Sequence, residues 1–391
     1  MKISVNTMRI LNAVATASSY VAKDGDHAGK LTISGIDGHL EVKVTNYVQT
    51  VVLRKIPFSS SDMTLDSIEA FSIDGKKLLT ALKAVKTESI ELERSSDILQ
   101  IKAGRSKFKI NLFDEVQDVE IFKKGKSLDI GDNLIENFKK VIHSVGINMP
   151  KYEVNGILIE IKSGLLNTVG TDTTRLSLIT AKTSNDDMEI IVPKDAISSI
   201  IRLFGHLDVI AFVDETSLTI STEILDYSTK LISGKFPAWQ RIVPQSFAQK
   251  FTINKDKFAT LVKEASLFDT QITVKIKDQK ILIKDFDGNT EVEDTVSDSN
   301  IDMNFHVNAK NILDFISSYS DDDITIGFNH SNLPFVLIAD STYKEIVMPI
   351  IIQDEKAVEQ GEDNAKAAES CSNSQSLWLL FKKSRSVFKI S

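Results

Sequence analysis

Hydrophobic and polar positions along the chain follow two periods, and the same order of the two recurs three times at a spacing of about 120 residues. Apolar residues spaced by three and four positions predict amphipathic helices over 8–21, 134–145 and 258–268. Alternation of apolar and polar residues predicts half-buried strands, most clearly over 156–161 and 272–276. The recurrence indicates a structural unit that occurs three times.

Each repeat continues with a second helix, a hairpin and a final strand. The second helices have a lysine near their start and are expected at 76–82, 194–200 and 310–316, with Asp74, Pro193 and Asn308 as start signals. The hairpins are expected at 90–92 with 99–101, at 209–212 with 218–220, and at 324–326 with 336–338. The final strands, each with a lysine, are expected at 107–110, 229–232 and 343–346.

This order predicts an α+β protein of three repeated domains, each with two helices packed on a mostly antiparallel sheet. The expected domains span 1–122, 123–250 and 251–352. Residues 353–391 break the pattern, because 353–376 is polar and acidic and cannot bury enough apolar surface to offset the entropy of ordering. We expect a disordered C-terminal tail there.

Composition fits a soluble globular protein, with 42% hydrophobic and 26% charged residues in a chain of 391. No apolar run approaches the roughly 18 residues that cross a bilayer. The first 17 residues resemble a signal peptide only faintly, because Asn6, Arg9 and Asn12 interrupt the apolar segment, and we interpret them as an amphipathic helix. Cys371 is the only cysteine, which excludes an intramolecular disulfide and favours a cytoplasmic location.

Catalytic chemistry has no convincing signature in the sequence. The six histidines are scattered, with no pair at the spacing of a helical zinc site: His27, His39, His143, His206, His306 and His330. No glycine-rich phosphate loop follows a predicted strand. Asp321 to Asp323 lack the staggered oxygen ligands of a cation loop and are more typical of a helix end. We therefore expect no enzymatic activity, no cofactor and no metal.

Five strings carry a resemblance to a known family by their order and spacing: Ala103–Phe108, Val154–Leu158, Thr171–Leu178, Lys235–Pro244 and Val347–Pro349. Over residues 1 to about 352 the chain resembles the bacterial DNA polymerase III sliding clamp, that is, the beta subunit or processivity factor. The resemblance implies a head-to-tail homodimer closed into a ring, with helices around a hole that holds double-stranded DNA. It also implies a non-enzymatic role in DNA replication, served by an ATP-driven clamp loader.

The net charge of −8 argues against DNA binding through a globally basic surface, so the implied lining helices are the place to test the resemblance. Thirteen basic and six acidic residues fall on or beside them, a net of +7. The residues expected to face DNA are Arg9, Lys76, Lys77, Lys83, Lys139, Lys140, Lys151, Tyr152, Lys194, Arg202, Lys257 and Lys310. Lysines on an amphipathic helix are equally typical of an ordinary solvated face, and that interpretation stays open.

The resemblance also implies a hydrophobic cleft between the second and third domains, where the replicative polymerase and other proteins with a clamp-binding motif dock a short peptide. Carried over residue by residue, its members are Val154, Thr171, Arg175, Leu176, Pro237, Ile242, Ile346, Val347, Met348, Pro349 and Ile350. Taken singly, Leu176 and Ile242 are as typical of a core, and Pro237 and Pro349 of strand ends.

For the dimer, the resemblance implies that Phe108 and Ile110 of one chain meet Leu267 and Phe268 of the other. Arg105 and Lys107 would face an acidic group made of Glu291, Glu293 and Asp294.

Two departures from the family pattern bear on the implied cleft. The family commonly has Gly-His where this chain has Thr173 and Thr174, and its chains usually end soon after the Met-Pro pair, whereas here 353–391 follow. Two rival functions remain: a peptide-binding scaffold that does not encircle DNA, and a hydrolase, which would need strongly perturbed titratable groups in a concave site.

The tail generates a first prediction. Gln375 to Phe381 resembles the Gln-then-Leu-Phe peptides that partners insert into the family's cleft, and it could equally be a sticky unstructured segment. If it occupies the cleft of its own chain, deleting 353–391 raises the measured affinity for a partner peptide, because an internal competitor is lost. An unchanged affinity would refute autoinhibition.

Overall fold

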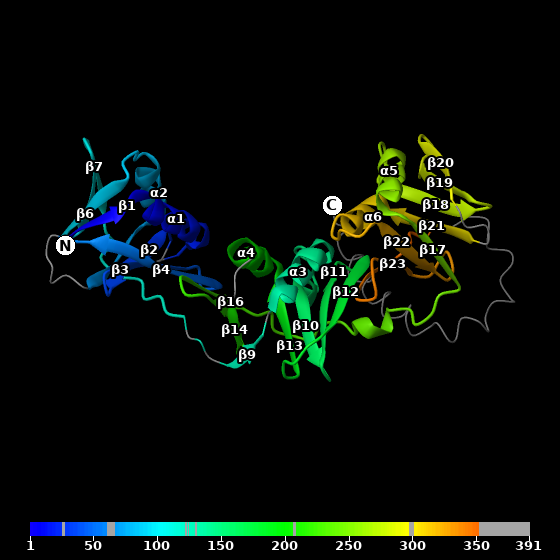
Figure 1. Cartoon of the computed structure of the whole chain (residues 1–391), viewed down its shortest axis with the longest axis horizontal. Coiled ribbons are helices and arrows are strands. Elements are labelled where there is room, and N and C mark those ends of the chain that lie inside the picture. The colour runs from blue at the N-terminus through cyan, green and yellow to red at the C-terminus, as the bar shows by residue number, and fades with distance from the viewer. Residues whose placement is uncertain are drawn as a thin grey trace, which may run out of the picture. The chain divides into compact units, whose positions relative to one another are not determined.

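The computed structural model describes residues 1–25, 28–60, 67–121, 123, 125–129, 131–205, 209–296 and 301–351 (Figure 1). The predicted tail at 353–391 lies outside the described residues, as do His27 and His206. Within the described ranges no helix is long and apolar enough to cross a membrane.

One order of elements occurs three times in the described chain: a strand, a helix, four strands, a helix and three strands. The first set is β1 (Lys2–Asn6), α1 (Thr7–Ala17), β2 (Lys30–Ile36), β3 (His39–Thr45), β4 (Gln49–Ser59), β5 (Ile68–Asp74), α2 (Gly75–Lys83), β6 (Ser89–Ser95), β7 (Ile98–Ala103) and β8 (Ser106–Asn111). The second is β9 (Lys126–Leu128), α3 (Gly131–Val141), β10 (Gly156–Lys162), β11 (Leu165–Thr171), β12 (Arg175–Lys182), β13 (Met188–Pro193), α4 (Lys194–Phe204), β14 (Ile210–Val213), β15 (Ser217–Ser221) and β16 (Leu225–Lys230). The third is β17 (Gln249–Asn254), α5 (Lys255–Ala265), β18 (Gln271–Lys277), β19 (Lys280–Asp285), β20 (Glu291–Thr295), β21 (Asp302–Asn308), α6 (Ala309–Ile316), β22 (Asp323–Phe328), β23 (Phe335–Ile338) and β24 (Tyr343–Val347).

The expectation that each repeat opens on a helix is wrong, because a short strand precedes each first helix. The first helix of each repeat also ends earlier than predicted, and α1 passes at Ser18 into a single 3-10 turn, whereas α2 and α4 extend beyond their predicted ends. Their starts agree better with expectation. The side chains of Asp74 and Asn308 accept hydrogen bonds from the first turns of α2 and α6, which satisfies backbone N–H groups that have no helical partner. The predicted boundaries of three separate domains stay a prediction.

By their internal contacts the residues form two compact units. The first unit holds 1–132 and 202–231, and its strands build a twelve-stranded sheet with the path β8-β7-β6-β1-β4-β16-β15-β14-β9. The pairing of β4 with β16, which places Val51 opposite Tyr227, joins strands of the first and second repeats. Helices α1 and α2 contact each other, and their apolar faces bury Ile10 and Leu82.

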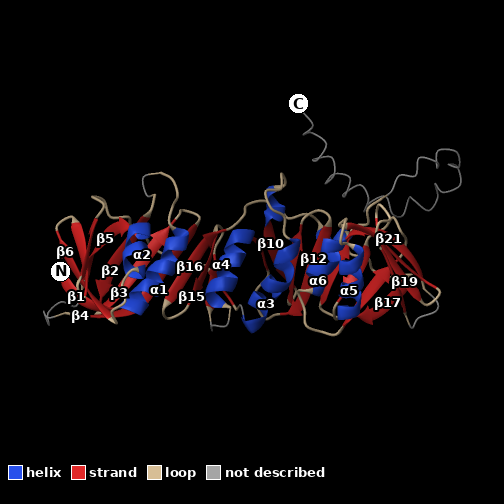
Figure 2. Cartoon of the chain, turned by 90° about the horizontal axis from the view of Figure 1, so that it is seen from above, coloured by secondary structure: helices blue, strands red, loops and turns tan. Residues whose placement is uncertain are grey.

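The second unit holds 133–201 and the described residues from 232 to 351. It contains an eight-stranded sheet, β13-β10-β11-β12-β24-β23-β22-β17, and a four-stranded sheet, β20-β19-β18-β21. In the larger sheet β12 of the second repeat pairs with β24 of the third. Helices α5 and α6 lie side by side over strands of this unit (Figure 2).

All pairings between these named strands are antiparallel, and the three predicted hairpins are confirmed as β6–β7, β14–β15 and β22–β23. The α+β class with two helices in each repeat is likewise confirmed. A sheet that continues from one repeat into the next leaves no free strand edge at either junction.

Candidate functional site

An apolar cluster lies where β12 meets β24, and it contains three residues of the predicted cleft. Leu176, Ile242 and Ile346 are buried in one cluster, and the β-ladder places Leu176 opposite Ile346. The other members are Leu158, Val169, Leu178, Ile191, Ile232, Phe236, Trp239 and Val336. The half-buried residues Val243, Phe247 and Ile338 pack against the cluster. Both repeats therefore contribute side chains to it.

The segment between β16 and β17 supplies the loop side of this cluster. A 3-10 turn at Trp239–Arg241 is closed by the Ile242 amide, which donates to the Trp239 carbonyl at 3.0 Å. The turn buries both Trp239 and Ile242, which explains how a stretch without strand structure adds to a core. Pro237 lies two residues before the first residue of this turn and is buried.

The turn between β11 and β12 is organised by Asp172. One carboxylate oxygen, Oδ1, accepts hydrogen bonds from the Thr174 amide at 2.9 Å, the Thr174 hydroxyl at 2.7 Å and the Arg175 amide at 3.1 Å. Thr173 has a φ of 74°, the left-handed region that β-branched residues rarely adopt. The chain thus places threonine in a backbone conformation that suits glycine, which is the residue common at this position in the resembling family.

Arg175 is buried and lies among three carboxylates. Its Nε lies 3.1 Å from Asp172 Oδ2, its Nη2 lies 2.9 Å from Asp314 Oδ2, and its Nη1 lies 4.0 Å from Glu345 Oε1. Nη2 also donates to the His143 carbonyl at 2.8 Å. Burial opposes the charge of the guanidinium, but the attraction of Glu345 and the two aspartates raises the pKa of Arg175 above its ordinary value.

Backbone hydrogen bonds place three more of the predicted cleft residues, Val154, Thr171 and Met348, near this turn, whereas the Ile350 amide donates to the His306 carbonyl on β21 at 2.7 Å. The Gly146 amide donates to the carbonyls of Val154 and Thr171, both at 3.1 Å. After β24, the Met348 amide donates to the Thr174 carbonyl at 2.9 Å. Three backbone hydrogen bonds therefore link Val154 to Thr171 through Gly146 and fix Met348, from the third repeat, to the turn that follows β11.

Exposure separates these residues into two groups. Most of the predicted cleft, including Leu176, Ile346 and Val347, is buried in the chain. Met348 and Ile350 are half-buried, as are Val243, Phe247 and Ile338, which sequence reasoning missed. The apolar surface that a ligand can reach at this junction therefore includes these five half-buried side chains. Their roles as peptide contacts stay a prediction.

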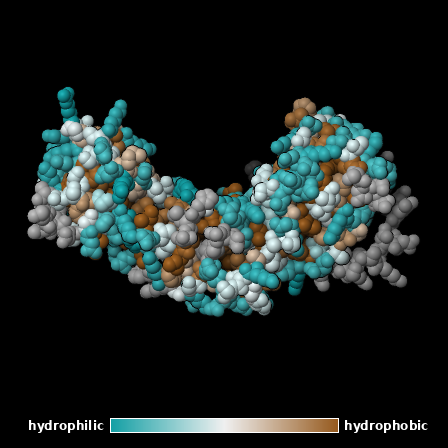
Figure 3. All heavy atoms as spheres, viewed as in Figure 1, coloured by the Kyte–Doolittle hydropathy of each residue, from teal (hydrophilic) through white to brown (hydrophobic). Residues whose placement is uncertain are grey.

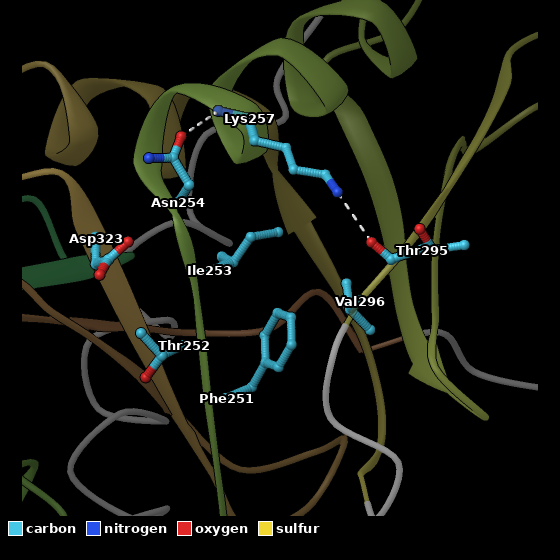
Figure 4. A pocket seen from close by; sticks show the side chains of 8 residues that line it. All are labelled: Phe251, Thr252, Ile253, Asn254, Lys257, Thr295, Val296 and Asp323. Carbon is cyan, nitrogen blue, oxygen red and sulfur yellow. Dashed lines mark hydrogen bonds between the residues drawn. The ribbon is translucent and has the colours of Figure 1, made fainter.

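A hollow of about 570 Å³ lies elsewhere, beside β17 and the end of β20 (Figure 4). It is lined by Phe251, Thr252, Ile253, Asn254, Lys257, Thr295, Val296 and Asp323, none of which belongs to the predicted cleft. The Lys257 ammonium donates to the Thr295 carbonyl at 2.9 Å and pairs with Asp294 at 3.1 Å. This cation, expected to face DNA, has local partners here.

The six described helices carry twelve basic and six acidic residues within their bounds, a net of +6 in a chain of net −8. Of the residues expected to face DNA, the exposed ones are Arg9, Lys76, Lys77, Lys83, Lys151, Tyr152, Arg202 and Lys310, and the half-buried ones are Lys139, Lys140, Lys194 and Lys257. Burial, together with nearby Arg175, lowers the pKa of Lys194. Its ammonium donates to the Val145 carbonyl at 2.7 Å.

The residues expected at a dimer interface lie on β8 and β20, the outermost strands of their sheets, and after α5, except that Arg105 lies in the turn between β7 and β8. Leu267 and Phe268 are 70% and 77% exposed, and Figure 3 shows apolar surface protruding at the end of α5. Phe108 is half-buried, whereas Ile110 is buried in its own chain. Glu291 pairs with Lys284 at 2.9 Å and Glu293 with Lys280 at 2.7 Å.

No group of three or more metal-ligating side chains occurs among the described residues. Two described histidines have other partners: the His143 Nε2 lies 2.6 Å from Glu345, and the His306 Nδ1 lies 2.7 Å from the Thr273 hydroxyl. Burial lowers the pKa of His306.

The left-handed turn gives a second prediction. Replacing Thr173 by glycine relieves steric strain and is expected to raise the free energy of unfolding by about 1 kcal/mol, measured by urea denaturation. The neighbouring substitution Thr174→Gly is the control, because it removes the hydroxyl that donates to Asp172 and is expected to destabilise the chain. Equal losses from both substitutions would show that the turn is not strained.

Comparison with known proteins gives consistent results. Residues 131–238 match the family described as DNA polymerase III beta subunit, central domain. The beta sliding clamp of Helicobacter pylori strain 26695 is 28% identical over 359 residues, which cover 86% of this chain and 94% of the relative. The Chlamydia pneumoniae beta sliding clamp is 22% identical over 304 residues, which cover 73% of this chain and 82% of the relative.

A crystal structure of the H. pylori beta clamp bound to a DNA ligase peptide is similar to this chain, with a TM-score of 0.83 and 26% identity over 90% of this chain and 100% of that one. The Pseudomonas aeruginosa DNA polymerase III subunit beta, at 18% identity and a TM-score of 0.82, shares the fold over the same fractions. Together with the triple element order, these matches show that the chain is similar to bacterial beta sliding clamps in sequence and in fold over most of its length.

Proposed function

We propose that two copies of this chain close into a ring that encircles double-stranded DNA and tethers the replicative DNA polymerase, so that synthesis becomes processive. The similarity to beta sliding clamps in sequence and fold supports the proposal. The observation from the chain itself that carries it is the net charge of the helices, +6 in a chain of −8.

This asymmetry suits a protein that holds DNA by enclosure. A ring needs no tight contact with any sequence, and a mildly cationic inner wall attracts phosphates while allowing the protein to slide. Acidic residues over the remainder of the chain repel DNA from other surfaces. Enclosure would therefore let an acidic protein work on DNA without becoming trapped on it.

The junction of β12 and β24 is the proposed docking site for partner peptides. A relative has been solved with a DNA ligase peptide, and in this chain the half-buried Val243, Phe247 and Met348 lie at the junction. Each leucine or phenylalanine that a peptide buried there would contribute about 1.5–3 kcal/mol. Methionine adapts to differently shaped ligands, which fits a site shared by several clamp-binding proteins.

The proposed dimer forms between β8 of one chain and β20 of the other. Both are edge strands, and β8 carries Lys107 and Lys109, whereas β20 carries Glu291 and Glu293. Pairing the two edges would satisfy backbone groups that otherwise face water, and their opposite charges favour it over pairing of like edges.

The proposed role is not enzymatic and uses no cofactor or metal, and we place the protein in the cytoplasm. Opening and closing of the ring would fall to a separate ATP-driven clamp loader. The proposal is tested by loading the protein onto nicked circular DNA with such a loader and separating free from bound protein by gel filtration. Retention that is lost when the DNA is linearised supports enclosure. Partner binding without retention would favour a peptide-binding scaffold.

Charge reversal on α2 tests the DNA-facing side. The double variant Lys76→Glu, Lys77→Glu is expected to weaken binding to a short duplex several-fold, because two phosphate contacts are lost. The plot of log affinity against log salt has a negative slope, and its magnitude is expected to fall by about 2. The matched control is Lys162→Glu, Lys182→Glu, which makes the same charge change at the ends of β10 and β12. Equal effects of the two double variants would exclude a specific DNA-facing role for α2.

Ionic strength tests the dimer. The charges on β8 and β20 are largely exposed, so added salt is expected to screen their attraction and shift the protein from dimer to monomer. Sedimentation velocity between about 0.05 and 1 M salt measures this shift, given that the screening length falls from above 10 Å to about 3 Å. A dimer that tightens with salt would instead indicate an interface dominated by apolar contact.

A further inference from the structure

A group of titratable side chains around the buried Arg175 and Glu345, at the junction of β12 and β24, has no role in the function proposed so far. We call it the Arg175 cluster and define it as His143, Asp172, Arg175, Asp314 and Glu345. Of these, sequence analysis selected only Arg175 for the cleft. The cluster draws on four regions of the second unit: the 3-10 turn after α3, the β11–β12 region, β24 and α6.

Side-chain contacts in and beside the cluster join the second repeat to the third. Arg175, from the second repeat, holds Asp314 on α6 and faces Glu345 on β24. His143, also from the second repeat, contacts the same Glu345 through Nε2 at 2.6 Å. The buried Ser177 hydroxyl donates to Glu345 as well. A fully buried carboxylate of the third repeat is thus surrounded by three side chains of the second.

Such a group constrains structure more than it adds stability. Removing two ions from water costs several kcal/mol each, so a buried pair contributes little net stability, while loss of one partner leaves an uncompensated charge. An antiparallel ladder alone can slip by two residues without turning any side chain to the other face. The Arg175 cluster opposes this slip, because Glu345 finds its partners in only one register.

The first unit contains a similar arrangement at its own repeat junction. Arg54 on β4 pairs with the fully buried Asp226 on β16. The Nε of Arg54 also lies 3.0 Å from Glu41 Oε1. Lys123 lies 3.3 Å from the same aspartate. Both junctions within the chain therefore combine a strand pair with an arginine and a buried carboxylate.

We propose that His143, Asp314 and Glu345 are positioning residues for peptide binding at the β12–β24 junction, acting through Arg175. This inference rests on the proposed function. Arg175 is bonded to Asp172 through its side chain and its amide, and Asp172 sets the left-handed turn at Thr173. The same turn presents the Thr174 carbonyl that accepts the Met348 amide. Fixing the guanidinium therefore fixes both sides of the predicted cleft.

The chain offers a matched pair of variants to test this role. Asp314 Oδ2 pairs with the buried Arg175 at 2.9 Å and with the exposed Lys310 at 2.8 Å. Burial opposes the charge of Asp314, but hydrogen bonds from Lys310 and Arg175 hold its pKa below the ordinary value, so it is ionised at neutral pH. Asp314→Asn preserves the shape and removes the charge facing Arg175. Lys310→Met removes the exposed partner and leaves the Arg175 contact in place.

The measurement is the affinity of each full-length variant for the DNA ligase peptide that the H. pylori relative binds, by fluorescence anisotropy. Asp314→Asn is expected to weaken binding about tenfold and Lys310→Met less than twofold. The loss should persist in sucrose, which restores folding stability but cannot replace the lost contact. Hydrogen exchange of the Met348 amide should speed up in Asp314→Asn more than exchange elsewhere in the sheet.

His143→Gln is the second variant, for use if Asp314→Asn fails to fold. It removes the imidazole and keeps an N–H donor for Glu345, and a smaller loss of affinity in the same direction is expected. Unchanged affinity in a folded variant, recovery in sucrose, or equal losses for Asp314→Asn and Lys310→Met would each overturn the positioning role. A folded wild-type chain that binds no peptide would instead reject the proposed function.

Discussion

An exposed strand edge has unpaired N–H and C=O groups, and the need to satisfy them shapes this chain more than any other constraint. Repeats meet through strand pairs: β4 with β16 in the first unit and β12 with β24 in the second. Each junction converts two edges into the interior of one sheet. What remains unpaired at the outer ends of the sheet paths includes β8 and β20, one basic and one acidic. In the dimer proposed for this chain, β8 of one molecule and β20 of another would pair in the same way.

The two junctions within the chain differ from the free edge strands in how deeply their carboxylates are buried. Asp226 and Glu345 are fully buried beside arginines, whereas Glu291 and Glu293 are exposed and paired with surface lysines. Exposed pairs are worth little and respond to salt, while breaking a buried pair is strongly destabilising. The chain therefore uses permanent charge contacts where strands belong to one molecule and weak ones at the edges left for another.

Much of the fold could be predicted from the sequence, because its signals are local. Helix periodicity and the caps Asp74 and Asn308 gave the second helices, and alternation gave the hairpins. The strands that open each repeat were missed for different reasons. β9, with three residues, has no room for a periodic pattern. β1 and β17 do alternate over five and six residues, and β1 was assigned to the helix that follows it. The pairing of β12 with β24 joins residues far apart in sequence, and no local pattern fixes its register.

In the candidate site, too, the residues with a local sequence signal were predicted, and those defined by tertiary contacts were not. Leu176 and Ile242 were selected from matched strings and Ile346 from the position just before one, and the structure brings the three into one cluster. His143, Asp314 and Glu345 were not selected, because a charged residue on a helix or strand is usually solvated. Only tertiary contact shows that these three surround a buried guanidinium. Phe247 was missed for a similar reason, since it follows the matched string and lies outside any predicted element.

Trp239 gives the junction a natural optical reporter. Its indole is buried in the apolar cluster, and its Nε1 has no hydrogen-bond partner among the described residues. An indole in such dry surroundings emits at shorter wavelength than one in water. The only other tryptophan of the chain is Trp378, in the segment after the last strand. Replacing Trp378 by phenylalanine would leave Trp239 as the single tryptophan, and the wavelength of its fluorescence maximum would then report the hydration of the β12–β24 junction.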